Sequence, residues 1–172
     1  MGSATVLDEA TLEEAHARLE RPVYNVVYRW LWDVEDSHEV VQEAFLRLWR
    51  MRDRVDVSRL DPLVYRIALN LARSLLRRRR VWRWTSLEPL RRMAAPGTSP
   101  EEQLLRASQN ERVRRAPEAL PIDLRRALVL AELSSLTHAQ IAETLGIAPG
   151  TVASRRHRAL KRLRESLEAD EL

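Results

Sequence analysis

The stretch THAQIAETLGIAPGTV, residues 137–152, decides the fold of the C-terminal part of this chain. Thr137, with Gln140 three residues later, forms a capping box, in which each side chain satisfies a free backbone N–H of the other residue at the start of a helix. Gly146 suits the left-handed turn that follows a helix, and Pro149 suits the first position of the next one. The stretch therefore predicts two helices joined by a tight turn, a helix-turn-helix.

The second helix of this motif is expected to have a buried side and a basic side. At about 100° per residue, Val152, Ala159 and Leu163 return to the inward side, and Ala142 in the first helix is small enough to let the two helices cross closely. Hydroxyls and cations on the opposite side can contact base edges and phosphates in a major groove. The alternative is a helical hairpin with a solvated basic face. The residues predicted to bind DNA are Thr151, Ser154, Arg155, Arg158, Lys161 and Arg162.

Arg156 belongs to the same helix but not to this set. It falls only about 40° from Val152 around the helix. We expect it at the margin of the core, with its stem packed and its charged head in solvent, where it is poorly placed to contact a base.

Charge is distributed unevenly along the 172 residues, whose formal net charge is +4. Residues 1–60 hold twelve acidic residues and eight arginines, whereas residues 71–92 hold eight arginines and one acid. Residues 148–164 hold six basic residues and no acid. Solvated helix faces would explain either basic cluster alone, but the combination indicates a protein partner at one end and a polyanion elsewhere.

Composition excludes several classes of protein and site. With four glycines and many Leu, Ala, Arg and Glu residues, the chain is expected to be all-α. The absence of cysteine rules out disulfides and thiolate metal sites. No apolar run approaches the ~20 residues that span a bilayer, and the acidic N-terminus is unlike a secretion signal, so we expect a cytoplasmic protein.

No catalytic site, metal site or cofactor is predicted. The four histidines have no ligand spacing. The stretch HEVVQ, residues 38–42, resembles a zinc-protease helix only until Gln42 replaces the second histidine. An enzyme is therefore the weakest of the functional alternatives.

Helical spacing predicts two small helical domains joined by a linker. The first, residues 10–80, is expected to hold three helical stretches, with Pro22 starting a new helix or kinking one, a polar turn at 33–37, and a charged loop at 50–61 before Pro62. Residues 81–115, rich in proline near their middle, are the expected linker. Residues 116–168 form the helix-turn-helix domain.

Two segments of the chain resemble one family. The segment LPIDLRRALVLAELSSLTHAQIAETLGIAPGTVASRRHRALKRLRESL, from Leu120 to Leu167, resembles the promoter-reading C-terminal domain of bacterial sigma factors of the extracytoplasmic-function (ECF) group. VVQEAFLRLWRMRDR, residues 40–54, followed by LVYRIALNLARSLLRRRR, residues 63–80, resembles the domain of that group that binds core RNA polymerase and melts promoter DNA. The resemblance implies a sigma factor that reads −10 and −35 promoter elements, with an anti-sigma factor as a further partner.

The resemblance also implies roles for particular residues. The C-terminal recognition helix would read the −35 element as duplex, and the loop at 50–61 would capture a base flipped from the −10 element. Phe45 and Trp49 suit the helical core equally well, and the polar Gln42 and Glu43 are the better candidates for contact. The −10 contacts implied are Asn70, Arg73, Arg77 and Arg78, and the core polymerase contacts are Val41, Gln42, Glu43, Phe45, Leu48 and Trp49.

A stand-alone helix-turn-helix regulator is the alternative from a different class. Such a protein would bind duplex DNA without polymerase, and it would leave the VVQEAFLRLW segment, residues 40–49, unexplained. Whether promoter binding requires core polymerase distinguishes the two.

Overall fold

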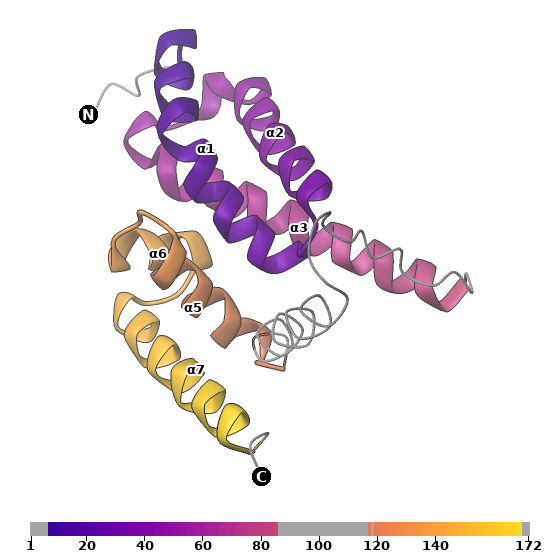
Figure 1. Cartoon of the computed structure of the whole chain (residues 1–172). Coiled ribbons are helices and arrows are strands. Elements are labelled where there is room, and N and C mark those ends of the chain that lie inside the picture. The colour runs from indigo at the N-terminus through magenta and orange to yellow at the C-terminus, as the bar shows by residue number, and fades with distance from the viewer. Residues whose placement is uncertain (1–6, 86–116, 118, 170–172) are drawn as a thin grey trace, which may run out of the picture.

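The computed structural model describes residues 7–85, 117 and 119–169, and these form α-helices, short 3-10 turns and no strand (Figure 1). The predicted all-α fold is confirmed. None of the described helices combines the length and the apolar character needed to cross a membrane.

Three helices build the N-terminal unit. Because apolar residues recur every three or four positions along them, each helix has one side that can be buried. α1 and α2 lie side by side and both pack on α3, which extends past them (Figure 1). Two 3-10 turns, Arg52–Arg54 and Val57–Arg59, form the connection between α2 and α3. The helices are α1 Glu9–Leu31, α2 Val34–Arg50 and α3 Leu60–Thr85.

The structure narrows one expectation about the breaks in this unit and corrects another. Pro22 does not start a new helix, because α1 runs through it from Glu9 to Leu31, and the buried residues Leu19 and Val23 on either side hold the helix against the core. The expected turn at 33–37 is instead the first turn of α2, because the Asp33 side chain accepts the Asp36 N–H at 2.9 Å and caps the helix.

The third helix is longer than predicted. α3 continues to Thr85, five residues past the expected end of the domain, because the segment 81–85 contains neither proline nor glycine. The expected linker residues 86–115 lie outside the described part of the chain.

The C-terminal unit is the predicted helix-turn-helix preceded by one helix. The Thr137 hydroxyl accepts the Gln140 N–H at 3.3 Å, and the Gln140 side chain accepts the Thr137 N–H at 2.9 Å, so the capping box is confirmed. Gly146 makes the turn with φ 66°, and Val152 is completely buried. The helices are α5 Ile122–Leu133, α6 His138–Leu145 and α7 Pro149–Ala169.

The two units are packed against one another. α6 contacts α3 and α5 contacts α1, while α7 lies beyond them (Figure 1). Leu130, Leu136 and Ile141 belong to the same apolar cluster as the core of α1–α3. A separate small cluster between α5 and α7 contains Leu120, Leu124, Leu128 and Ala159.

Candidate nucleic-acid and protein interfaces

The outer side of α7 carries hydroxyls and cations, as the helical spacing predicts. Ser154, Arg158, Lys161 and Arg162 are exposed. The Arg158 Nε donates to the Ser154 carbonyl at 3.4 Å, and Lys161 lies 3.8 Å from the Glu165 carboxylate. These contacts are local and exposed, so they compete weakly with a phosphate for the same cations.

Arg155 and Arg156 both reach back toward α5. The Arg155 side chain is 22% exposed and its guanidinium lies 3.9 Å from the Asp123 carboxylate. Arg156 donates to the Glu132 carboxylate at 2.6 Å, with 42% of its side chain exposed. Arg156 therefore lies at the expected margin of the core, held by a partner that spacing along one helix could not reveal.

Four predicted −10 contacts form an exposed stripe along α3. Asn70, Arg73, Arg77 and Arg78 all face solvent. Arg79, in the same basic run, instead pairs with Asp33 at 3.3 Å and with Asp36, at the start of α2. The arginine run therefore divides into exposed members and one member that ties α3 to α2.

Arg126 is a cation that the sequence did not single out. It is half-buried on α5, and this burial, together with the nearby positive charge of Arg73, holds the pKa of its guanidinium below the ordinary value. Asp123 opposes this effect and Arg155 adds to it. The α3 stripe and the recognition helix are therefore both within electrostatic reach of one residue.

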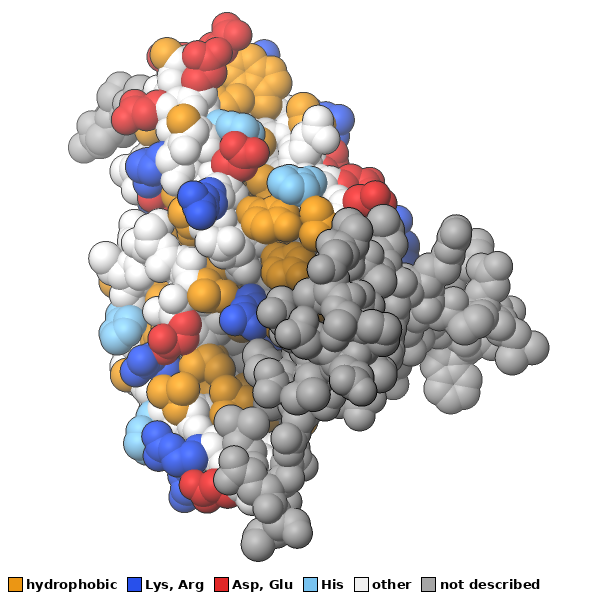
Figure 2. All heavy atoms as spheres, in the orientation of Figure 1, with side chains coloured by type: hydrophobic (Ala, Val, Ile, Leu, Met, Phe, Trp, Pro, Cys, Tyr) orange, Lys and Arg blue, Asp and Glu red, His pale blue; other side chains and the backbone are white. Residues whose placement is uncertain are grey.

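A shallow groove of about 380 Å³ runs between α1 and α2. Leu46, which the sequence did not predict as a contact, is 44% exposed there, and acidic side chains gather near the N-terminal end of α1, at the top of the face in Figure 2. Val41 and Leu48 are buried beneath, so they support this surface without forming it. The groove is lined by Glu9, Leu12, Glu13, His16, Gln42, Phe45, Leu46 and Trp49.

Glu43 is occupied by contacts within its own helix. Its carboxylate accepts from the Arg47 Nε at 2.7 Å and lies 3.5 Å from the Arg50 guanidinium. The hydrogen bond from Arg47 lowers the pKa of the Glu43 carboxyl, and the charge of Arg50 adds to the effect. Of the two polar residues predicted to contact the polymerase, Gln42 is the more available.

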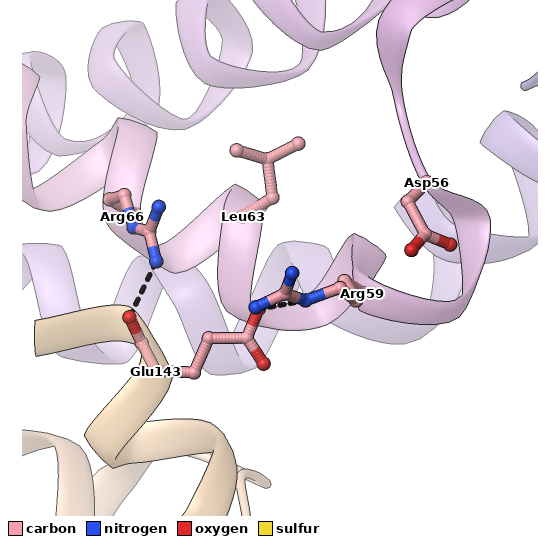
Figure 3. Close-up of a pocket in the computed structure, with 5 residues that line it drawn as sticks. All are labelled: Asp56, Arg59, Leu63, Arg66 and Glu143. Carbon is pink, nitrogen blue, oxygen red and sulfur yellow. Dashed lines mark hydrogen bonds and ion pairs between the residues drawn. The ribbon is translucent and has the colours of Figure 1, made fainter. Parts of the chain in front are cut away.

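A second hollow, of about 170 Å³, lies where the two units meet. The Arg59 Nε lies 2.5 Å from the Glu143 carboxylate, and Arg66 donates to the Glu143 carbonyl at 2.5 Å (Figure 3). Within the described residues, no group of three or more histidine, aspartate or glutamate side chains could hold a metal ion. The hollow is lined by residues of both units: Asp56, Arg59, Leu63, Arg66 and Glu143.

Two family models match the two units. The model for sigma-70 region 2 matches residues 16–81, and the model for sigma-70, region 4, matches residues 110–163. Among curated proteins, the ECF RNA polymerase sigma-E factor of Escherichia coli K12 is 34% identical over 152 residues, covering 83% of this chain and 78% of that protein. The ECF RNA polymerase sigma factor SigW of Bacillus subtilis is 29% identical, covering 84% of this chain and 82% of the relative.

Other relatives are longer or known by structure. The ECF RNA polymerase sigma factor SigE of Mycolicibacterium smegmatis is 32% identical over 84% of this chain, which spans only 57% of that protein. The structure of CnrH with the cytosolic domain of CnrY matches with a TM-score of 0.71 at 22% identity, over 95% of this chain and 91% of that one. RpoE of Bartonella quintana, in complex with the anti-sigma factor NepR, matches with a TM-score of 0.66 at 23% identity, over 92% and 97%. At these identities the two structures support the fold.

Proposed function

The chain belongs to the ECF family of RNA polymerase sigma factors, and we propose that it binds core RNA polymerase and directs initiation by reading −10 and −35 elements with separate domains. The observation that carries this proposal is the exposed cationic side of α7 on a complete helix-turn-helix. A recognition helix that presents arginines beside hydroxyls can make bidentate contacts with guanine and anchor on phosphates.

The C-terminal domain supplies the −35 contacts. Ser154 and Arg158 are exposed, and they can reach base edges when α7 enters the major groove. Arg155 must give up its ion pair with Asp123 before it can contact a base edge. The free energy of that DNA contact is therefore partly offset by the loss of the ion pair. Thr151, Lys161 and Arg162 complete the surface, the cations serving mainly as phosphate contacts.

The N-terminal domain supplies the −10 contacts and drives melting. Arg73, Arg77 and Arg78 can neutralise phosphates, while Asn70 offers an amide to an unstacked base. The segment 50–61, which connects α2 to α3 through two 3-10 turns, receives the flipped base. Trapping an extruded base offsets the cost of unstacking it, so melting needs no nucleotide hydrolysis, and the proposal assigns no catalytic step to this chain.

The groove between α1 and α2 is the surface for core polymerase. Gln42, Leu46 and Trp49 offer it polar and apolar contacts, and Phe45 packs beneath with His16 at 4.6 Å between ring centroids. Because polymerase and promoter lie together in the cell, the chain acts in the cytoplasm. An anti-sigma factor, of the kind seen with the Bartonella RpoE, is the expected inhibitor.

Transcription in vitro with purified core polymerase on a library of promoter fragments tests the proposal. Specific initiation that depends on this chain is expected, and the initiated fragments identify its two elements. Sequence-specific DNA binding by the chain alone, with no initiation, would instead indicate a stand-alone regulator.

A matched pair of variants tests the assignment of α7. Arg158→Ala should weaken binding of the polymerase complex to promoter DNA by roughly 1–3 kcal/mol if Arg158 reads a base. Arg164→Ala removes the same charge from the same helix, outside the predicted set, and should have less effect. Equal losses for both variants would show that α7 contributes only general electrostatic attraction to DNA.

A variant of α3 tests the assignment of phosphate contacts. Arg78→Ala should weaken binding to all DNA sequences alike and flatten the salt dependence of binding.

A further inference from the structure

Trp49 lies where two surfaces with different proposed roles meet. It lines the groove between α1 and α2 that is proposed for core polymerase, and it is the last residue but one of α2. The segment 50–61, proposed to receive the flipped base, begins directly after it. Trp49 is half-buried, so part of it is available to a partner that docks in the groove. A contact made on Trp49 is therefore made beside the segment that receives the base.

Arg52, in the first 3-10 turn of this segment, contacts Trp49 in two ways. Its guanidinium lies over the Trp49 ring, with Cζ 4.6 Å from the ring centroid. Its Nη1 donates to the Trp49 carbonyl at 3.3 Å, at the C-terminal end of α2, where the helix dipole favours positive charge. Arg52 therefore holds the start of the segment against a residue that lines the groove.

The first 3-10 turn has few other restraints. Between residues 51 and 59 only Val55 is buried, with 3% of its surface exposed. The second turn is stabilised by the Asp56 carboxylate, which accepts the Ser58 N–H at 3.0 Å and the Ser58 hydroxyl at 2.6 Å. The first turn has no side-chain cap. Its position therefore depends on the burial of Val55 and on the two contacts of Arg52 with Trp49.

A partner in the groove would strengthen both contacts between Arg52 and Trp49. A cation is held more strongly over an aromatic ring when water is excluded, and a hydrogen bond is stronger where the dielectric constant is low. Trp49 and Arg52 are each only half-buried in the free chain, so a partner that covers Trp49 removes water from these contacts. Docking in the groove would thus hold the first turn more firmly.

We propose that Arg52 is a positioning residue that couples docking of core polymerase in the groove to capture of the flipped base, by holding the first 3-10 turn against the ring and the carbonyl of Trp49. The inference rests on the proposed function, which assigns the groove to polymerase and the segment 50–61 to the base. Arg52 acts through Trp49 on one side and through the backbone of the turn on the other. Because coupling between two binding events is reciprocal, capture of the base also strengthens the hold on polymerase.

Amide exchange of the segment tests the coupling in the absence of DNA. In hydrogen-exchange mass spectrometry, saturating core polymerase should slow exchange at residues 51–55 of the parent chain and should slow it much less in Arg52→Ala. Unchanged exchange in α1 and α3 of the free variant would show that it is folded. A parent segment that gains no protection from polymerase would overturn the proposal.

Arg54→Ala is the matched control for this measurement. Arg54 lies in the same 3-10 turn as Arg52 and is exposed, so the variant removes the same charge from the same turn. It should keep the protection that the parent chain shows with polymerase. Equal protection in the parent, Arg52→Ala and Arg54→Ala chains would show that polymerase covers the segment directly, and the coupling through Arg52 would then be wrong.

Initiation on two forms of one promoter tests the consequence of the coupling. A fragment that the parent chain initiates is prepared as a full duplex and with mismatched bases that hold its −10 element open. Because capture of the base offsets the cost of unstacking it, Arg52→Ala should slow open-complex formation on the duplex by about tenfold. It should initiate on the opened fragment at nearly the parent rate, whereas Arg54→Ala should change the two rates by one factor. Equal losses on both forms for Arg52→Ala would contradict a role in positioning.

A double-mutant cycle tests whether Arg52 acts through Trp49. Trp49→Leu removes the ring and weakens polymerase binding, so rates are compared at saturating concentrations of the chain. In this background Arg52→Ala should cost much less than in the parent chain, whereas independent effects would add and would overturn the proposal. If the parent chain neither binds polymerase nor initiates, the proposed function fails and the coupling with it. If the parent does both and the cycle is additive, the coupling alone fails.

Discussion

The two helical domains bury their apolar side chains by different routes. In the N-terminal domain, Leu19, Val26 and Leu48 are fully buried among three long helices that contact one another. Among the described residues, the C-terminal domain has a separate cluster of four buried residues, and its Leu130 and Ile141 belong to the cluster shared with α1–α3. A helical unit of about 50 residues is marginal on its own. The C-terminal domain therefore depends on its neighbour for stability, whereas the N-terminal domain is largely self-contained.

The largest expected effect comes from the N-terminal core. Leu48→Ala removes a fully buried side chain and should lower the free energy of unfolding by roughly 2–5 kcal/mol. Because the C-terminal domain packs on this core, amide exchange should rise in both domains. Thermal unfolding with hydrogen-exchange mass spectrometry measures both effects. Leu46→Ala, on the same helix at a site 44% exposed, should cost much less, and an equal loss would contradict the burial argument.

The next effect belongs to the C-terminal domain. Val152→Ala should lower stability by about 2 kcal/mol, because two methyl groups leave a completely buried position. Amide exchange should rise in α5–α7 and stay unchanged in α1 and α2. If protection were lost equally in α1 and α2, the proposed asymmetry between the domains would be wrong.

A smaller loss is expected at the start of α6. Thr137→Ala removes the hydroxyl that accepts the Gln140 N–H, and loss of such a cap typically costs about 1 kcal/mol. Thr137→Ser keeps a hydroxyl at the same position and should retain most of the stability. Chemical denaturation of the two variants measures the difference, and equal stabilities would show that the cap contributes little.

The smallest effect concerns acid pH and Glu43. The Arg47 hydrogen bond lowers the pKa of this carboxyl below its ordinary 4.5, so its contribution to stability is present above that pH and is lost as the pH falls through the lowered value. Glu43→Gln should therefore differ from the parent chain near neutral pH and converge with it in acid. In an Arg47→Gln background the difference should shrink. A difference that grows toward acid pH would contradict the sign.

Elements set by local chemistry could be predicted from the sequence. Thr137 with Gln140, Gly146 and Pro149 determine where α6 begins and ends and where α7 begins, because capping and positive φ depend on a few adjacent residues. Pro22 left two outcomes open, a new helix or a kink, and the helix continues through it, since the packing around a helix can outweigh one missing hydrogen bond. Asp33 misled the prediction, because the same residue type favours turns and helix starts.

Contacts between distant segments could not be predicted in this way. The outward direction of Ser154 and Arg158 follows from helical periodicity, but the approach of Arg155 to Asp123 requires the crossing of α5 and α7. Arg125 lies among apolar residues on α5, and its position becomes intelligible only once Trp30 is placed beside it. The spacing of residues within one segment carries no information about such contacts between different helices.

Arg66 of α3 donates to carbonyls near the end of α6, and Arg125 of α5 donates to carbonyls near the end of α1. This reciprocal contact has a consequence for the exchange of domains between family members. Each domain carries one of the two arginines and the carbonyls that accept hydrogen bonds from the other. The residues that fit the two domains together are therefore encoded in two different halves of the gene. A chimera that combined this N-terminal domain with a C-terminal domain from a relative would lose this fit, and with it part of the stability that the C-terminal domain draws from its neighbour. Recombination within the family would then create proteins that keep their recognition helices but differ in how well their two domains fit together.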